Sequence, residues 1–325
     1  MKACIFGAGA IGGLLAVRLS QAGWEVSVIV RGSHLDAIRQ GGLRLRSQRE
    51  EVTVHPYATD RVVDIGSQDI VLVTTKTTSL VGIADNLSRL VGPETTVAFV
   101  TNGLPWWYLT QIEPSSKVWS APVGEMIEAM SRTIPLSCCI GGVAYCASHI
   151  AEPGLIVNSN SDNSRFVFGA VKDEAAALCD ALAAALTASG LPTQQQRPLA
   201  PVIWMKLLQN VVTAPLGALT GLTSKRVVTE PMLAATVKAA TEETQSLAAA
   251  CGVTDVAVDL EKFAARVADH KSSMLQDYEL SRRPEIDTLL GALCDLGRIK
   301  GRRTPVLDML YALTAAKARA LGLYP

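Results

Sequence analysis

The sequence predicts an α/β domain built on a parallel sheet, followed by a second domain made only of helices. The first hundred residues alternate short apolar runs with helical patterns, which is typical of parallel strands joined by crossover helices. Residues 191–201, LPTQQQRPLAP, hold three prolines and three glutamines without periodicity, as a linker does. Only helical patterns follow. We therefore expect an α/β domain over residues 1–192 and a helical domain over residues 193–325.

The individual elements follow from apolar periodicity. The run DIVLVTT at residues 69–75 is continuous, which predicts a strand buried on both faces of its sheet. In the first domain we expect strands at residues 2–6, 25–30, 69–75 and 95–100, shorter strands between 137 and 168, and helices at 11–21, 79–90 and 174–188. In the second domain we expect helices at residues 202–213, 231–251, 256–269, 285–300 and 305–320.

The composition indicates a compact globular protein. The chain has 325 residues, 49% of them hydrophobic and 18% charged, with a formal net charge of zero. Its charges are scattered without runs, so we expect no nucleic-acid partner. Windows without charged residues at 95–112, 133–151 and 207–224 are interrupted by proline, glycine or asparagine, and we interpret them as buried core rather than membrane spans.

The cysteines point to a reducing compartment. There are seven, an odd number, and no Cys-x-x-Cys pair occurs. We therefore expect free thiols, no metal site and a cytoplasmic location. The uncharged stretch after Lys2 could suggest a secretory signal, but its glycines are spaced for a different purpose.

The glycines of the sequence GAGAIG at residues 7–12 have the spacing of a dinucleotide-binding turn. This turn follows an expected strand and opens an expected helix. In a dinucleotide-binding turn the first glycine permits the tight bend, the second lets a pyrophosphate approach, and the third allows close helix packing. The alternative is an ordinary glycine turn, which the strand–helix context disfavours. We expect a Rossmann-type domain whose cofactor contacts include Gly7, Ala8, Gly9, Ala10, Ile11 and Gly12.

Two basic residues favour NADP as the cofactor. NAD sites place an acid about 20 residues beyond the fingerprint, and this chain has Arg31 there, which can bind a 2′-phosphate. Lys76 follows an apolar strand, where open α/β sheets bind ligands, and is a second candidate contact. A solvated arginine and a snorkelling lysine are the alternatives.

Polar side chains in apolar surroundings give the remaining candidates. Asn102 ends an expected strand and offers both a donor and an acceptor, although asparagines before glycine are common in plain turns. Lys206 and Asn210 are spaced i, i+4 and share one face of an apolar helix. Such a lysine either snorkels to solvent or protonates a reacting oxygen, and its spacing does not decide between these. Glu285 follows a proline, so it could simply complement a helix dipole.

Taken together, these segments resemble the ketopantoate reductase (2-dehydropantoate 2-reductase) family over nearly the whole chain. The similarity rests on GAGAIG at residues 7–12, Arg31, Thr-Lys-Thr at 75–77, Asn-Gly at 102–103, Trp204-x-Lys206-x3-Asn210, SSMLQD at 272–277 and Glu285-Ile286-Asp287. The resemblance implies an NADPH-dependent oxidoreductase that acts on CH–OH groups. It would reduce 2-dehydropantoate to pantoate, a step of pantothenate biosynthesis.

The resemblance also implies residue roles. Lys206 corresponds to the proton donor, and Asn210 and Ser273 to substrate contacts. Asn102 corresponds to a residue that touches both cofactor and substrate, and Glu285, which we also count as catalytic, to the acid near the cofactor ribose. Ala147 corresponds to a backbone contact with the cofactor.

Three departures leave the substrate open. Ala214 and Ser224 stand where the family has asparagines, and residues 104–108 add aromatic bulk that could line a larger pocket. Ser224 could reach the substrate through a water. The alternatives are a related NADP-dependent reductase of another 2-oxo acid, a β-hydroxy acid or an imine, and a non-catalytic NADPH sensor. The only macromolecular partner that we expect is a second copy of the chain, in a homodimer.

Overall fold

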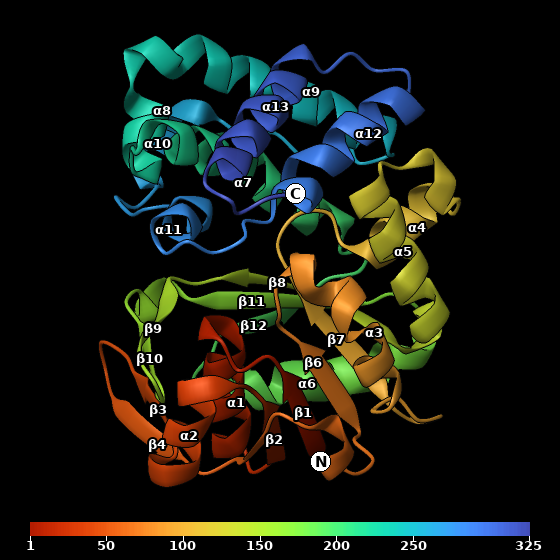
Figure 1. Cartoon of the computed structure of the whole chain (residues 1–325), viewed down its shortest axis with the longest axis vertical. Helices are drawn as coiled ribbons and strands as arrows, with labels where there is room; N and C mark the ends of the chain where they lie inside the picture. Colours follow the sequence, from red (N-terminus) through yellow and green to blue (C-terminus); the bar gives the residue numbers. More distant parts are fainter. The chain divides into compact units, whose positions relative to one another are not determined.

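The computed structural model describes residues 1–325, and the chain folds into two compact units. Unit 1 consists of Met1–Thr101 and Ala129–Leu199, and unit 2 consists of Asn102–Glu128 and Ala200–Pro325. All strands lie in unit 1, whereas unit 2 contains only helices and loops (Figure 1). The expected fold class, a Rossmann-type α/β domain followed by an all-α domain, is confirmed.

The unit boundaries differ from the expected division at residue 192. Residues 193–195 of the expected linker form strand β12 (Thr193–Gln195), which pairs with β11 (Arg165–Ala170) and so belongs to unit 1. Asn102–Glu128 lies within the expected first domain but belongs to unit 2. Contacts with segments distant in the sequence decide both assignments, and local composition does not record such contacts.

An eight-stranded sheet forms the centre of unit 1, in the order β12-β11-β8-β7-β6-β1-β2-β5. The six consecutive strands β8-β7-β6-β1-β2-β5 are parallel to one another, and β11 runs antiparallel to β8. The first strand therefore lies between β2 and β6, where the strand order reverses and open α/β sheets bind ligands. The other bounds are β1 (Lys2–Phe6), β2 (Glu25–Ile29), β5 (Tyr57–Thr59), β6 (Ile70–Val73), β7 (Thr96–Val100) and β8 (Cys139–Tyr145).

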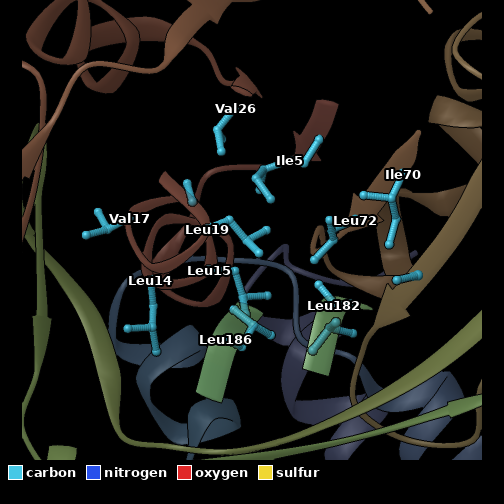
Figure 2. Packing of buried hydrophobic residues seen from close by; sticks show 14 of the residues in the cluster. Ile5, Leu14, Leu15, Val17, Leu19, Val26, Ile70, Leu72, Leu182 and Leu186 are labelled. Atoms are coloured by element: carbon cyan, nitrogen blue, oxygen red, sulfur yellow. The ribbon is translucent and has the colours of Figure 1, made fainter. Parts of the chain in front are cut away.

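The core of unit 1 forms around helix α1 (Ala10–Gln21). Leu15 and Leu19 of α1 are fully buried, and they belong to one apolar cluster with Ile5 of β1 and Leu182 of helix α6 (Ala176–Ala188), as Figure 2 shows. Burial of each leucine contributes about 1.5–3 kcal/mol relative to an exposed side chain. This packing fixes α1 against the sheet, so the turn that opens α1 is held at the carboxyl end of β1. The remaining helices of this unit are α2 (Gly32–Gly41) and α3 (Leu80–Ser88).

A second sheet of four strands, in the order β4-β3-β10-β9, was only partly expected. Its strands are β3 (Leu43–Arg46), β4 (Glu51–Val54), β9 (Ser148–Glu152) and β10 (Leu155–Asn158). It contacts α1 closely, because a Cβ atom on Gly13 would lie 2.6 Å from Ile156 Cγ1 of β10. The glycine at position 13 is therefore required for this close packing.

Unit 2 is built around the long helix α7 (Ala200–Thr220), which packs against α9, α11 and α13. The expected end at residue 213 is wrong, since the helix continues through Pro215 to Thr220. Its second half is buried, and this burial compensates for the hydrogen bond that the proline removes. The other helices are α4 (Trp106–Ile112), α5 (Ala121–Thr133, shared with unit 1), α8 (Ser224–Thr229), α9 (Ala234–Ala250), α10 (Leu260–Arg266), α11 (Ser273–Glu279), α12 (Ala292–Ile299) and α13 (Pro305–Ala320).

Helix α7 is also long and apolar enough to cross a membrane, judged by length and composition alone. Its most apolar window has a mean hydropathy of 1.3, and 67% of that window is buried inside the protein. Packing against the neighbouring helices accounts for this apolar character.

Candidate active site

In the glycine-rich turn, residues 7–12, Gly7 and Gly12 cannot be replaced by a larger residue, each for its own structural reason. Gly7 has a φ of +101°, and a Cβ atom there would lie 2.6 Å from Thr75 Cγ2. A Cβ atom on Gly12 would lie 2.2 Å from the carbonyl oxygen of Gly7 and 2.3 Å from Thr74 Oγ1. The fold itself therefore requires glycine at both positions.

Gly9 differs from both, because nothing in the protein requires glycine there. Its φ of −71° is accessible to any residue, and no atom lies within 4 Å of the position that a Cβ atom would occupy. Gly9 precedes α1, whose N-terminus has no side-chain cap. The open space beside Gly9 and the uncapped amides of α1 together suit an anion, and a pyrophosphate fits this description.

Two threonines at the end of β6 support the same turn. Thr74 Oγ1 donates a hydrogen bond to the carbonyl oxygen of Gly7 at 2.7 Å. Thr75 Oγ1 is buried and has no hydrogen-bond partner within the protein. An unsatisfied buried hydroxyl is costly, so it marks a position where a ligand atom would be stabilised. Sequence analysis did not identify Thr75 on its own, although two hydroxyl residues after a buried apolar strand could have indicated it.

The charged cofactor candidates lie at the carboxyl ends of strands that flank β1. Arg31 is exposed and immediately precedes α2, two residues beyond β2. Lys76 is three residues beyond β6. Ala147 is two residues past β8, and strands β7 and β6 lie between β8 and β1 in the sheet. Its carbonyl oxygen accepts a hydrogen bond from Ser159 N at 2.9 Å. The structure thus places the first two beside the glycine-rich turn and Ala147 three strands away.

Lys206 and Asn210 lie on the half-exposed face of α7, as their spacing predicts. Both side chains are partly exposed, whereas Trp204 and Leu207 on the other face are buried. Trp204 Nε1 donates a hydrogen bond to Tyr108 Oη at 2.7 Å, which anchors α7 two residues before the lysine. The helix therefore presents an ammonium and an amide side by side from a rigid support.

The start of α11 lies against the same helix. A Cβ atom on Gly217, seven residues after Asn210 on one helical face, would lie 3.3 Å from Ser272 Oγ. Ser272 caps α11, and Ser273, its first residue, is exposed. Ser224 is buried, with a relative exposure of 3%. Its backbone N–H donates a hydrogen bond to the carbonyl oxygen of His270 at 2.8 Å. These contacts bring the serines to the same region of unit 2.

Asn102 and Glu285 are 183 residues apart in sequence, and the fold brings them into contact. Asn102 Nδ2 donates a hydrogen bond to Glu285 Oε2 at 3.3 Å. Gly103 has a φ of +74°, and a Cβ atom there would lie 2.4 Å from the carbonyl oxygen of Thr288. Leu104 N donates to that same oxygen at 2.9 Å. The turn that carries Asn102 is thus docked onto the segment that follows Glu285.

That segment is a π-helical turn, η8 (Asp287–Gly291), and not the regular helix that we expected from residue 285. Asp287 is buried, and its Oδ1 accepts hydrogen bonds from the hydroxyls of Tyr311 and Tyr324. Burial and the contact with this carboxylate raise the pKa of Tyr324. A π-helical turn costs regular hydrogen bonding and is frequent at functional sites, and here it begins two residues after Glu285.

The aromatic residues at 106–108, which the sequence suggests could line a pocket, are almost completely buried. Trp106, Trp107 and Tyr108 have relative exposures of only 1%, 4% and 8%. Tyr108 accepts the hydrogen bond from Trp204 described above, so this segment supports α7. Ala214 is likewise buried. No group of three or more histidine, cysteine, aspartate or glutamate side chains is arranged to hold a metal ion.

Comparison with known proteins identifies the family. The model of the ketopantoate reductase PanE/ApbA family matches residues 3–173, and the model of its C-terminal domain matches residues 199–318. The chain is 34% identical to a 2-dehydropantoate 2-reductase of Mesorhizobium japonicum over 100% of both chains.

Solved structures agree with this assignment. A putative ketopantoate reductase from Ralstonia solanacearum MolK2 superposes with a TM-score of 0.85 at 30% identity over 99% of both chains. A D-mandelate dehydrogenase, solved with NADH and anilino(oxo)acetate, has the same fold, with a TM-score of 0.83 at 22% identity over 99% of this chain and 100% of that one. Family models that cover most of the chain and a full-length relative lead to one conclusion. The chain belongs to the ketopantoate reductase family of oxidoreductases that act on CH–OH groups.

Proposed function

We propose that the protein uses NADPH to reduce a 2-oxo acid to the corresponding 2-hydroxy acid, and that 2-dehydropantoate is its substrate. The observation that carries the proposal is the pair Lys206 and Asn210 on the half-exposed face of an otherwise apolar helix. An ammonium and an amide held rigidly together suit a substrate that has a reacting carbonyl and further oxygens. The glycine-rich turn of unit 1 supplies the site for the reductant.

Unit 1 would hold the cofactor by its anionic groups. The pyrophosphate would lie in the open space beside Gly9, at the uncapped N-terminus of α1. The guanidinium of Arg31 would form paired charge-assisted bonds with the 2′-phosphate, which distinguishes NADPH from NADH. Thr75 Oγ1 and Lys76 would add contacts, and Ala147 and Asn102 complete the proposed set, with Glu285 at the ribose.

The chemical step requires one hydride and one proton. Bound NADPH supplies the hydride that adds to the carbonyl carbon. Lys206 would stabilise the negative charge that develops on the carbonyl oxygen and would donate the proton that completes the hydroxyl group. The exposed hydroxyl of Ser273 would bind the substrate carboxylate, Asn210 would hold a further oxygen, and Ser224 would assist at longer range.

Glu285 has a second task in this proposal. It accepts a hydrogen bond from Asn102, so the amide of Asn102 is oriented before any ligand binds. Such preorganisation reduces the entropy that is lost when the substrate binds. Retention of Lys206, Asn210, Ser273 and Glu285 in one chain favours a catalyst over a non-catalytic NADPH sensor.

The substrate is the part of the proposal that has a specific rival. Ala214 is buried on α7 and offers no polar atom where the family has an asparagine, so one bond to a substrate hydroxyl would be missing. The Mesorhizobium relative is named for 2-dehydropantoate, which favours that substrate. The fold is shared with a D-mandelate dehydrogenase. A related 2-oxo acid with an apolar side chain is therefore the second candidate. The cysteine content favours the cytoplasm as the site of action.

One assay tests the proposal. NADPH oxidation would be followed with a panel of 2-oxo acids that includes 2-dehydropantoate and an aryl 2-oxo acid, and NADH would serve as the control. Lys206→Ala should lower kcat by at least about 100-fold at nearly unchanged NADPH affinity, because general acid catalysis contributes this much. Lys238→Ala, at an exposed lysine of α9, is the matched control and should retain full activity. Normal turnover by Lys206→Ala would refute its assignment.

A further inference from the structure

His34 bridges the glycine-rich turn and the second sheet of unit 1. The residue lies in the first turn of α2, three residues after Arg31. Its Nε2 lies 2.9 Å from the carbonyl oxygen of Ala8, within the glycine-rich turn. Its Nδ1 accepts a hydrogen bond from Gly154 N at 2.8 Å, at the bend between β9 and β10. Neither contact belongs to a helix or a strand ladder, so the imidazole joins the three segments through side-chain hydrogen bonds.

The two partners determine the protonation state of this imidazole. Gly154 N can only donate, so Nδ1 must carry a lone pair, and the Ala8 carbonyl can only accept, so Nε2 must carry the hydrogen. The ring is therefore neutral and has a single tautomer. Burial lowers the pKa of His34, which is consistent with a neutral ring at physiological pH.

The bond to Ala8 reaches the part of the turn that faces the ligand. Ala8 N donates to the carbonyl oxygen of Ile29 at 3.3 Å, so both backbone polar groups of Ala8 are held. The Ala8 carbonyl and the Gly9 N–H belong to one planar peptide group, and the Gly9 N–H donates a hydrogen bond to the carbonyl oxygen of Gly7 at 2.7 Å, so fixing the Ala8 carbonyl also fixes the shape of the turn. Gly9 is the residue beside the open space.

Gly154 is seated closely on the same helix. Its φ is +80°, and a Cβ atom there would lie 3.2 Å from Ala37 Cβ of α2. Its carbonyl oxygen accepts a hydrogen bond from Arg44 N of β3 at 2.8 Å. The second sheet therefore holds the imidazole through the hydrogen bond from Gly154 N to Nδ1. On its other side the imidazole donates a hydrogen bond from Nε2 to the carbonyl oxygen of Ala8 in the glycine-rich turn.

We propose that His34 is a positioning residue for the dinucleotide, which holds the pyrophosphate turn in register with the start of α2, where Arg31 would bind the 2′-phosphate. This inference rests on the proposed cofactor site and extends it, because it gives the second sheet a role in cofactor binding. His34 itself touches no reacting atom. It acts through the Ala8 carbonyl, so its loss weakens the binding of NADPH and leaves hydride transfer in the occupied enzyme unaffected.

Two isosteric variants separate this role from plain support of the fold. The amide of asparagine occupies the position of Nδ1, so His34→Asn keeps an acceptor for Gly154 N and loses the donor to Ala8. The amide of glutamine reaches the position of Nε2, so His34→Gln keeps the donor to Ala8 and loses the acceptor. Each variant therefore removes one of the two hydrogen bonds, and a purely structural role predicts equal effects.

The measurements are the Kd of NADPH by fluorescence titration, kcat and KM with the active 2-oxo acid, and the melting temperature without ligand. We expect His34→Asn to raise the Kd and KM of NADPH about 5- to 10-fold, as for the loss of one hydrogen bond. We expect His34→Gln to stay within about twofold of the wild type. For both variants, kcat at saturating NADPH should change by less than about twofold.

Equal NADPH affinities in the two variants, or a loss confined to kcat, would overturn the inference. Failure of the proposed function has a different signature, because the wild-type protein itself would then fail to bind NADPH or to turn over any 2-oxo acid. If the wild-type protein binds NADPH and His34→Asn binds it with the same Kd, only the role of His34 is rejected and the proposed function stands.

Discussion

The contrast between Gly9 and Gly12 gives a prediction in which stability and binding separate. In Gly9→Ala the new methyl group enters open space at an ordinary φ of −71°, so the folded protein meets no clash. Alanine caps a helix less well than glycine, which costs up to about 1 kcal/mol. The lower entropy of the unfolded chain offsets this by about 0.4–1 kcal/mol. The free energy of unfolding should therefore change by less than about 1 kcal/mol.

Gly12→Ala should show the opposite behaviour in stability. Its methyl group would lie 2.2 Å from the Gly7 carbonyl oxygen and 2.3 Å from Thr74 Oγ1. Backbone or β6 must move, and overpacking of this kind typically costs about 1–3 kcal/mol. The gain in helix propensity returns about 1 kcal/mol at most. A fall in melting temperature of several degrees is expected, at about 2–4 °C per kcal/mol.

Binding should then distinguish the variants. In Gly9→Ala the methyl group occupies the space into which the pyrophosphate would come, and one hydrogen bond to a charged phosphate is worth about 1.5–3 kcal/mol. Its loss raises the Kd of NADPH by about 10- to 100-fold. Thermal unfolding without ligand and fluorescence titration with NADPH measure the two effects. Wild-type NADPH affinity in Gly9→Ala would refute the assignment of the open space to the dinucleotide, and unchanged stability in Gly12→Ala would refute the close packing.

Three further predictions follow. Arg31→Asp should shift cofactor preference from NADPH towards NADH, because a carboxylate repels the 2′-phosphate and accepts a bond from the 2′-hydroxyl; unchanged selectivity in kcat/KM would exclude Arg31 from this role. Tyr324→Phe removes a donor to the buried Asp287 and should lower stability by about 1 kcal/mol in thermal unfolding at pH 7. Because the pKa of Tyr324 is raised, the unfolded state loses its proton first as the pH exceeds about 10, so stability falls there. Tyr324→Phe should flatten this alkaline slope, and an identical slope would show that other groups cause it. Leu15→Ala should destabilise unit 1 by about 2–5 kcal/mol in denaturant unfolding, since Leu15 is fully buried; a loss below about 1 kcal/mol would contradict the described core.

Periodicity alone predicted the elements whose pattern was strongest. The strand at residues 2–6 and the helix at residues 305–320 have the expected bounds. The strand at residues 43–46 was missed, although its sequence LRLR alternates as a half-buried strand should, with Leu43 and Leu45 buried. Arginine at every second position obscured the apolar signal, although one partner strand, β4, begins only five residues later; the other partner, β10, is more than 100 residues away.

In the candidate site, too, features that depend on neighbouring residues could be predicted, whereas features that depend on contacts between distant segments could not. The i, i+4 spacing of Lys206 and Asn210 was sufficient to place both on one face of a helix. The role suggested for His34 could not be predicted, because its partners Ala8 and Gly154 lie 26 and 120 residues away in the sequence. Thr75 is similar, since only the folded structure shows that its hydroxyl is buried and unsatisfied.

The crossing of the chain between its two units limits how the protein can be divided. A fragment that ended at residue 199 would contain all of unit 1 but also residues 102–128, which belong to unit 2. Tyr108 would then lack its hydrogen-bond donor Trp204, and the buried aromatic residues Trp106 and Trp107 would remain in the fragment without the rest of unit 2. Such a fragment would expose a cluster of aromatic side chains and would tend to aggregate. Unit 1 is therefore not a transferable module in this protein, and a fusion or truncation that aims to isolate it must also replace the segment after Thr101.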